Sequence, residues 1–482
     1  MRRTKIVATL GPATDDPKVM EGIIRAGVDV VRINFSHGDV EEHLQRIRQV
    51  RECAAAVGRD VGVLADLQGP KIRIHRFVGG AVELEEGARF ILDADLAPDA
   101  GTHQAVGISY KDLPLDVAAG DTLLLDDGRI VLAVEEVRGS QVICRLKVSG
   151  TLSDNKGINR QGGGLSAPAL TAKDRQDIRI AAELQVDYLA VSFPRSAVDV
   201  SEARELLRAA GGHGGIVAKI ERVEAVDDIE AILKVSEAVM IARGDLGVEI
   251  GDAELPGVQK RILRLARAMN RVSITATQMM ESMIRNPTPT RAEVLDVANA
   301  VMDGTDAVML SGETAVGQYP VQAVQAMSRI CQGAERQWET PPSEYHMNSH
   351  FERVDEAIAT AAMYTANHLG VRAIVSMTES GSTVLWMSRV SSGIPIYALT
   401  RHQTTRRRLT LYRGVYPLRF DVVHINPAWV IQAAINAVQH RRLVSRGDLV
   451  IVTKGDSSGV PGGTNTLKIV RVGDRLAPEE HP

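Results

Sequence analysis

A lysine and two carboxylates lie near one another in the sequence, each at the end of a short apolar stretch. Lys219 and Glu221 follow the apolar residues 216–218, and Asp245 follows the next apolar stretch, 238–242. Residues two apart on an extended chain point to the same face, so Lys219 and Glu221 would lie side by side. Buried charges are costly unless they bind a ligand, a metal ion or each other, so a structural ion pair is the alternative interpretation.

The donor types indicate which ion would bind there. Two carboxylates with few other hard ligands suit Mg²⁺, which keeps waters and bridges to phosphate oxygens. Neither a cysteine nor a histidine joins Glu221 and Asp245 in these stretches, which argues against Zn²⁺. The sequence therefore predicts a Mg²⁺ site, with Mn²⁺ as an alternative that these residues do not distinguish.

Three further apolar stretches end in polar side chains. Arg32, Asn34 and Ser36 alternate with apolar residues, so they project to one face and could clamp phosphate oxygens or a cation. A polar strand end without a ligand is the alternative. Thr277 and Ser311 end two other stretches, where a hydroxyl could bind phosphate or carboxylate, or pass a proton through water. Taken singly, each hydroxyl is more typical of a helix N-cap.

All these residues end strand-like segments, and eight such segments lie between residues 4 and 313. They are rich in Val, Ile, Thr and Ala and alternate with helix-length segments, which is typical of a parallel sheet. Eight βα units predict a (β/α)8 TIM barrel, whose catalytic groups lie at the C-terminal strand ends. The segments are residues 4–10, 29–36, 61–67, 188–193, 215–221, 238–245, 272–278 and 307–313.

Two breaks in this alternation divide the α/β chain into domains. Helical periodicity disappears between residues 71 and 168, where short strands and turns follow one another. We expect the barrel at residues 1–70 and 169–340, with a small β-barrel domain at 71–168 inserted after the third strand as a lid over the mouth. A polar linker at 340–343 and renewed alternation predict a C-terminal open α/β domain at residues 350–482.

Composition narrows the class of protein. At 482 residues the chain exceeds one hydrophobic core, and a net charge of −4 excludes nucleic acid as the main partner. The three cysteines lie far apart without metal-ligand spacing, which fits a reducing compartment. The sequence has no signal-peptide pattern and no membrane-length apolar run, so we expect a cytoplasmic protein without a membrane partner.

The motifs together resemble those of pyruvate kinases over essentially the whole chain. The resemblance implies phosphoryl transfer from phosphoenolpyruvate to ADP, giving pyruvate and ATP, the final step of glycolysis. It also implies a homotetramer. The matching motifs lie at residues 5–12, 32–38, 66–73, 218–221, 242–247, 276–283 and 309–314.

The resemblance assigns roles at the catalytic centre. Glu221 and Asp245 would hold Mg²⁺, while Lys219 and Arg32 would meet the charge on the phosphoryl group. Thr277 would help to protonate the enolate through ordered water.

The remaining roles concern the relay, the substrate carboxylate and the nucleotide. Ser311 would be a relay member, and the amides of Gly244 and Asp245 would bind the substrate carboxylate. The expected nucleotide or phosphate contacts are Asn34, His37, Arg73 and Lys156.

One departure from the family concerns K⁺. Many members hold this ion with groups that match Asn34, Ser36, Asp66 and the backbone of Leu67, and carry a glutamate where this chain has Lys71. An ammonium at that place can supply the charge of the ion. We therefore predict a vestigial monovalent cation site and activity without K⁺.

A hydroxyl-rich loop at residues 378–383 follows a predicted strand and begins a predicted helix. Its backbone amides and the helix dipole could bind a phosphate. In the family this loop belongs to the allosteric sugar-phosphate site. Members that respond to fructose 1,6-bisphosphate often carry a basic residue where this chain has Glu379, and a carboxylate would repel a second phosphate. A sugar monophosphate effector is therefore favoured, with a domain that serves only assembly as the alternative. The expected effector residues are Thr378, Ser380, Gly381, Ser382, Thr383 and Thr464.

Two other functions compete with this prediction. A barrel lyase or aldolase that handles a pyruvate enolate with Mg²⁺ needs no ADP site, so Lys156 and the motif at 32–38 argue against it. A non-catalytic sugar-phosphate sensor has no need of a complete phosphoryl-transfer set. The presence of this set argues against it: Lys219, Glu221, Asp245 and Thr277.

Overall fold

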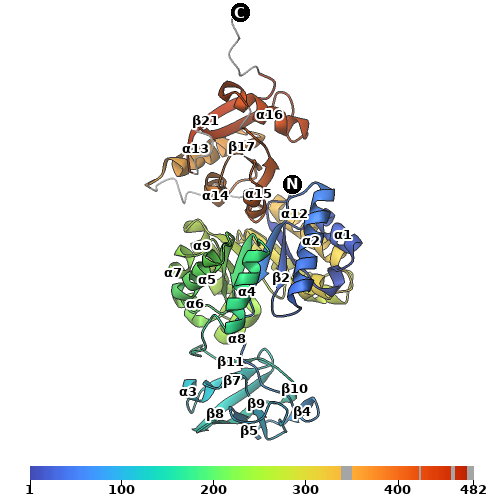
Figure 1. Ribbon diagram of the computed structural model, residues 1–482, viewed down its shortest axis with the longest axis vertical. Coiled ribbons are helices and arrows are strands. Elements are labelled where there is room, and N and C mark those ends of the chain that lie inside the picture. Colours follow the sequence, from blue (N-terminus) through green and yellow to red (C-terminus); the bar gives the residue numbers. More distant parts are fainter. Residues whose placement is uncertain (338–349, 423–424, 457–461, 475–482) are drawn as a thin grey trace, which may run out of the picture.

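The structure, a computed structural model, describes residues 1–337, 350–422, 425–456 and 462–474. Three parts follow one another along the long axis of the molecule (Figure 1). A (β/α)8 barrel lies in the middle, an inserted β domain lies at one end and a C-terminal α/β domain lies at the other. The predicted fold class is confirmed. The predicted linker at 340–343 lies outside the described residues.

The barrel contains all eight predicted strands in a closed parallel ring, in the order β1-β16-β15-β14-β13-β12-β3-β2. Seven of the strands are buried along their whole length, as expected for strands covered by helices outside and packed against one another inside. The exception is β2, where Arg32 and Asn34 are only half buried because they reach the mouth. The strands are β1 Lys5–Thr9, β2 Val30–Asn34, β3 Gly62–Asp66, β12 Tyr188–Val191, β13 Gly215–Ile220, β14 Ala238–Ala242, β15 Val272–Ala276 and β16 Ala307–Leu310.

Amphipathic helices surround this ring and bury their apolar faces against it. Capping boxes begin three of them, formed by Thr171 and Asp174 at α4, Ser196 and Asp199 at α5, and Thr290 and Glu293 at α10. The helices are α1 Pro17–Ala26, α2 Val40–Val57, α4 Ala172–Glu183, α5 Ala197–Ala209, α6 Val223–Asp227, α7 Ile229–Lys234, α8 Arg243–Ile250, α9 Leu255–Ala268, α10 Arg291–Met302, α11 Gly312–Ala315 and α12 Pro320–Gln337, with 3-10 turns at η1 Pro12–Thr14 and η2 Glu281–Ile284.

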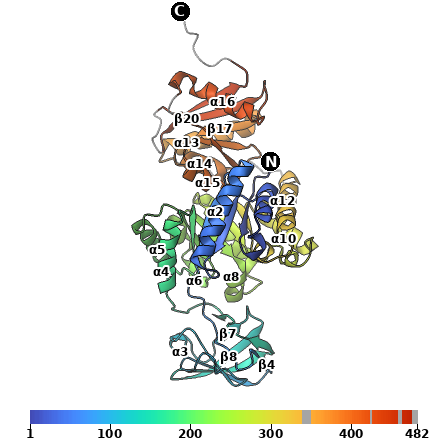
Figure 2. The same cartoon turned by 45° about the vertical axis from the view of Figure 1, so that its right-hand side comes forward.

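The inserted domain leaves the barrel after β3 and returns before α4, as predicted. Figure 2 shows it as a separate lobe next to α6 and α8. Its strands form a mostly antiparallel six-stranded sheet, β11-β7-β8-β9-β5-β6, and a two-stranded sheet, β10-β4, around an apolar core of their own. The elements are β4 Ala81–Leu84, β5 Arg89–Asp93, β6 Ala105–Gly107, α3 Leu113–Asp116, β7 Thr122–Leu125, β8 Ile130–Arg138, β9 Gln141–Val148, β10 Gly150–Ser153 and β11 Ile158–Arg160.

The C-terminal domain is an open sheet in the order β19-β18-β17-β20-β21, parallel except for the antiparallel β21. Its helices α14 and α15 lie next to the barrel (Figures 1 and 2). The elements are α13 Val354–Leu369, β17 Ala373–Met377, α14 Ser382–Arg389, β18 Ile396–Thr400, α15 Gln403–Leu409, β19 Val415–Arg419, η4 Pro427–Trp429, α16 Val430–His440, β20 Leu449–Gly455 and β21 Thr464–Arg471.

A buried ion pair joins this domain to the barrel. Arg389, at the end of α14, pairs with Asp306, just before β16, and their side chains are only 2% and 3% exposed. Arg389 Nη1 donates to Asp306 Oδ2 at 2.9 Å and to the Arg271 backbone oxygen at 2.7 Å. Burial alone would raise the pKa of Asp306, but the Arg389 guanidinium lowers it below its ordinary value.

We expect Arg389→Met to lower the free energy of unfolding by about 3–5 kcal/mol, because it leaves Asp306 buried without its partner. The matched control is Arg25→Met, which removes an exposed pair with Glu21 and should cost less than about 1 kcal/mol. The pair stabilises the fold fully above the ordinary Asp306 pKa of 3.8, and this contribution is lost as the pH falls through the lower, folded-state value. Urea unfolding of both variants measures the difference, and equal losses would contradict the prediction.

Within the described ranges, no helix is long and apolar enough to cross a membrane.

Candidate active site

Four charged side chains from neighbouring strands meet at the mouth of the barrel. Arg32 lies in β2, Asp66 ends β3, Lys219 lies in β13 and Glu221 directly follows it. Arg32 Nε donates to Asp66 Oδ2 at 2.6 Å, and Lys219 Nζ lies 3.3 Å from Asp66 Oδ1 and 2.9 Å from Glu221 Oε1. We call these four residues the charged cluster. The structure thus brings together residues 32, 66, 219 and 221, which lie far apart in the chain.

Burial and pairing perturb the acidity of the charged cluster. Burial alone would raise the pKa of Asp66, but Lys219 and Arg32 lower it below the ordinary value. For Lys219, burial acts against the ammonium, but Asp66 and Glu221 outweigh it and raise the pKa. Burial raises the pKa of Glu221, with nearby Asp245 adding to the effect and Lys219 opposing it. All three directions follow from charges held together in a region with little water.

Glu221 and Asp245 fit a divalent cation. Their mutual repulsion contributes to the raised pKa of Glu221, and a cation between them would remove that repulsion. Within the described parts of the chain, no three His, Cys, Asp or Glu side chains converge into a complete protein cage. An ion held by two carboxylates would take its other ligands from water and substrate. Mg²⁺ is commonly coordinated in this way in proteins.

Thr277 lies in a strained turn directly after β15. Thr277 and Gln278 both have positive φ, 66° and 52°, which is uncommon for residues other than glycine. Thr277 Oγ1 donates to the Ala276 backbone oxygen at 2.6 Å and accepts from the Gly244 amide at 2.9 Å. The Gly244 amide, predicted to bind a substrate carboxylate, therefore donates to the Thr277 hydroxyl in this structure.

Sequence reasoning missed the side chain that holds this turn. Arg243, the first residue of α8, is buried and donates to the backbone oxygens of Thr277 at 2.9 Å and Gln278 at 3.1 Å. Its guanidinium also pairs with Asp296 of α10 at 2.7 Å. Arg243 thus ties the strained turn to a neighbouring helix. Its position beside Gly244 and Asp245 was the only sequence signal.

Ser311 differs from the other predicted hydroxyls. Its Oγ is buried and has no hydrogen-bond partner among the described residues. Its amide donates to Glu313 Oε2 at 2.7 Å. A buried hydroxyl without a protein partner can form a hydrogen bond with an ordered water molecule. A proton relay requires such a hydrogen bond.

The residues predicted for a monovalent cation have protein partners. Asn34 Oδ1 accepts from the Ser36 amide at 3.1 Å, Asp66 belongs to the charged cluster, and the Leu67 backbone oxygen accepts from a serine hydroxyl. Lys71 Nζ lies 3.8 Å from Asp245 Oδ1, on the side of the predicted Mg²⁺ ligands. The ammonium is therefore placed at the mouth, where it supplies positive charge beside a carboxylate.

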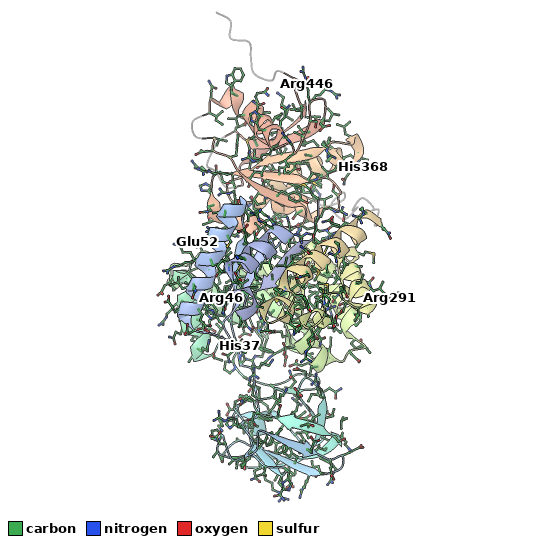
Figure 3. The ribbon with its side chains drawn as sticks, turned by 90° about the vertical axis from the view of Figure 1, so that its right-hand side faces the viewer. His37, Arg46, Glu52, Arg291, His368 and Arg446 are labelled. Atoms are coloured by element: carbon green, nitrogen blue, oxygen red, sulfur yellow. The ribbon has the colours of Figure 1, made fainter. Side chains whose placement is uncertain are left out.

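The predicted nucleotide contacts lie on two domains. Figure 3 shows His37 on the part of the barrel that faces the inserted domain, and Asn34 ends β2 nearby in sequence. Arg73 and Lys156 belong to the inserted domain, where Arg73 Nη1 donates to the Asn155 backbone oxygen at 2.7 Å and Lys156 pairs with Asp126 at 2.7 Å. The structure does not bring the two pairs into contact.

A small cavity lies between the inserted domain and the barrel mouth. Lys71 and Asp245 line it, together with Arg222 and Glu249, which sequence reasoning missed. Glu249 Oε2 accepts from the Val223 amide at 3.1 Å, and Arg222 Nη1 donates to the Leu165 backbone oxygen at 3.1 Å. Burial raises the pKa of Glu249 to about 7. These contacts tie the returning chain of the inserted domain to the elements that follow Glu221 and Asp245.

The predicted effector loop borders a second cavity, which lies in the C-terminal domain. Of the predicted residues, Thr378, Thr383 and Thr464 line it, and the Thr383 and Thr464 hydroxyls are 2.8 Å apart. Of the other three, Ser380 and Gly381 lie in the loop before α14, and Ser382 is the first residue of that helix.

Three basic residues near this cavity were missed by sequence reasoning. Arg401 and Lys454 line it, and Arg401 lies 3.8 Å from Glu379. Glu379 also pairs with His402. The Arg401 guanidinium offsets part of the negative charge that Glu379 brings to the cavity.

Comparisons with known proteins agree with this arrangement. Residues 1–324 match the family model described as pyruvate kinase, barrel domain, and residues 356–470 match pyruvate kinase, alpha/beta domain. Pyruvate kinase II of Salmonella typhimurium is 56% identical over 98% of this chain and 99% of its own length. The pyruvate kinase of Haemophilus influenzae is 54% identical over 94% of this chain and 96% of its own length, and that of Mycobacterium tuberculosis is 42% identical over 98% and 99%. The chain therefore belongs to the pyruvate kinase family and is a phosphotransferase.

Proposed function

We propose that this protein transfers the phosphoryl group of phosphoenolpyruvate to ADP, giving pyruvate and ATP. The observation that carries the proposal is the charged cluster beside Asp245 at the barrel mouth. Arg32 and Lys219 offer two cations for a phosphate. Glu221 and Asp245 offer two carboxylates for a metal ion. Phosphoryl transfer requires both kinds of group.

Glu221 and Asp245 would hold Mg²⁺, or Mn²⁺ in its place. The bound ion would neutralise charge on the phosphate and carboxylate oxygens of the substrate. Lys219 and Arg32 would stabilise the negative charge on the phosphoryl group during transfer. Both already lie at the mouth, held by Asp66, so little rearrangement is needed when substrate binds.

The enolate left after transfer must be protonated at carbon. The Lys219 ammonium stabilises the enolate oxygen until the proton arrives. Thr277 is placed to deliver it through water, because Arg243 holds its turn and its hydroxyl lies next to the start of α8. The unpartnered Ser311 hydroxyl is the candidate for the next relay position.

ADP would be bound by both domains. Asn34 and His37 on the barrel, and Arg73 and Lys156 on the inserted domain, are the candidate contacts. A nucleotide that touches both pairs would draw the inserted domain onto the mouth as a lid and exclude water from the reaction.

We expect full pyruvate formation from phosphoenolpyruvate, ADP and Mg²⁺ when tetramethylammonium is the only monovalent cation. Lys71 supplies the positive charge near Asp245 that K⁺ would otherwise provide. Lys71→Glu should lose most of this activity and recover it when K⁺ is added. The initial rate of pyruvate formation in the two buffers measures the effect.

Two other outcomes of this assay would contradict parts of the proposal. Wild-type activity only with K⁺ would keep the reaction and reject the role of Lys71. No activity in either buffer, even with sugar phosphates present, would favour a lyase or a sensor instead.

The C-terminal cavity supports allosteric activation by a sugar monophosphate. Threonine hydroxyls, Arg401 and Lys454 around the cavity suit one phosphate, while Glu379 occupies the place of a second. We expect glucose 6-phosphate to activate more strongly than fructose 1,6-bisphosphate, and Thr383→Val to lose the activation because it removes the hydroxyl beside Thr464. Saturation curves for phosphoenolpyruvate with each sugar phosphate measure it.

The matched control for this variant is Thr410→Val. Thr410 is also buried in the C-terminal domain, but its hydroxyl donates to the Arg407 backbone oxygen, and Thr410 does not line the cavity. Stronger activation by the bisphosphate would reject the selectivity assigned to Glu379.

Exposed apolar side chains on the C-terminal domain support assembly into a homotetramer. Large apolar residues on the surface of a domain mark places where another chain can pack. On α13 and β21 they are Val354, Tyr364, Leu369 and Ile469. A solution mass of four chains by light scattering tests this assignment.

A further inference from the structure

Ser192, which sequence reasoning did not single out, lies inside the charged cluster. It directly follows β12 and is 1% exposed. Its Oγ accepts a hydrogen bond from Lys219 Nζ at 2.6 Å and donates to the Leu67 backbone oxygen at 2.7 Å. Ser192 is thus the closest partner of the Lys219 ammonium.

Three acceptors hold the Lys219 ammonium. An ammonium has three N–H groups, and the structure directs them to Ser192 Oγ, Glu221 Oε1 and Asp66 Oδ1. The hydroxyl has one hydrogen, which it gives to Leu67, so its lone pairs face Lys219. Among the described residues, Ser192 is the neutral member of these three partners.

The two carboxylates have other demands on them. Asp66 also accepts from Arg32 at 2.6 Å, and Glu221 accepts from the Phe193 amide at 2.7 Å and is the candidate metal ligand. When substrate and metal bring new charges to the mouth, both carboxylate contacts must adjust. The contact with Ser192 is different, because its acceptor is neutral. The Ser192 hydroxyl donates mainly to the Leu67 backbone oxygen at 2.7 Å, and Asp66 Oδ1 is a second, longer acceptor at 3.3 Å.

The serine itself is fixed on two sides. One side is the bond to Leu67 at the end of β3. The other is Gly69, whose φ is +68° and where an added Cβ would lie 2.8 Å from Ser192 Cβ. This close approach leaves no room for the serine to move toward the inserted domain.

We propose that Ser192 is a positioning residue. It holds the Lys219 ammonium at the barrel mouth when the carboxylate partners of Lys219, Asp66 and Glu221, rearrange to contact metal and substrate. The inference rests on the proposed pyruvate kinase reaction, since it assigns Lys219 to the phosphoryl group. Ser192 does not touch substrate. It acts by fixing the position of the Lys219 ammonium, because a small displacement of that charge lowers the rate of phosphoryl transfer.

The test is Ser192→Ala in the full-length enzyme, assayed with phosphoenolpyruvate, ADP and Mg²⁺. We expect kcat to fall about 10-fold to 100-fold, as for loss of one hydrogen bond to a charged group, while both KM values change less than about 2-fold. Ser192→Cys keeps the shape of the side chain but offers only a weak sulfur acceptor, so it should show a comparable fall.

The matched control is Ser236→Ala. Ser236 is also a buried barrel serine whose hydroxyl donates to a backbone oxygen, that of Ile232 at 2.8 Å, but it touches no charged side chain of the mouth. Its kcat should equal that of the wild type. Thermal unfolding of each variant gives the folded fraction, by which the rates are corrected.

Each other outcome overturns the proposal. Wild-type kcat in Ser192→Ala would show that Lys219 needs no such anchor. Full activity in Ser192→Cys would reduce the serine to a packing role, and an equal loss in Ser236→Ala would reduce it to general stability. An inactive wild type would instead reject the proposed reaction, which separates that failure from this one.

Discussion

We expect Lys219→Met to lower kcat on the order of 10²-fold to 10³-fold, because it removes the cation proposed to meet charge in the transition state. Methionine fills a similar volume but carries no charge, so the loss reports electrostatics rather than a cavity. Arginine at the same position should also lose most of the rate, since a planar guanidinium cannot make the three contacts of the ammonium. Steady-state kinetics of pyruvate formation measures both variants.

The control for Lys219 is Lys260→Met. Lys260 also pairs with an aspartate, Asp303, but its side chain is exposed on α9 and makes no contact with the charged cluster. Its kcat should match the wild type. Because Lys219→Met leaves Asp66 and Glu221 buried without their shared cation, thermal unfolding must accompany the kinetics. A loss below about 3-fold in folded protein would contradict the role of Lys219 as a transition-state stabiliser.

Glu221→Gln is the second large effect, and its first readout is metal binding. The amide keeps the shape but loses the negative charge, so we expect the affinity for Mn²⁺ to fall at least about 10²-fold and kcat/KM to fall by a similar factor. Electron paramagnetic resonance of free Mn²⁺ during titration measures the affinity without turnover. Raising the Mg²⁺ concentration should restore part of the activity, because binding follows mass action.

Glu237→Gln is the matched control for Glu221. Glu237 is a partly buried carboxylate between α7 and β14, at the opposite end of the barrel strands, where it pairs with Arg204 at 2.9 Å. It should bind Mn²⁺ as the wild type does. If Glu221→Gln also did so, the metal site would have to lie elsewhere.

Local pattern was sufficient to predict the barrel strands and the residues that lie at their ends. Buried parallel strands are apolar along their whole length, so each of the eight was visible as a short run rich in β-branched residues. Because parallel strands in a barrel share one C-terminal end, the residues that end those runs had to converge. Arg32, Asp66, Lys219 and Glu221 do so.

The residues that hold the mouth residues in place could not be predicted from local sequence pattern. Ser192 binds Lys219 across 27 residues, Arg243 holds Thr277 across 34 residues, and Arg401 lies near Glu379 in the effector cavity. A serine after a strand or an arginine at a helix start is common, and nothing local marks which one will meet a catalytic group. These contacts depend on the distance between elements after packing.

The sequence by itself determined the barrel, the place of the insertion, the open C-terminal sheet and the mouth residues, because strand periodicity and strand-end chemistry are local properties of the chain. Only the tertiary structure decided the partners of those residues: Lys71 beside Asp245, the Gly244 amide on Thr277, Arg389 on Asp306 and Ser192 under Lys219. The physical reason is that hydrogen bonds and ion pairs act over about 3–4 Å, whereas the sequence orders residues only along the chain.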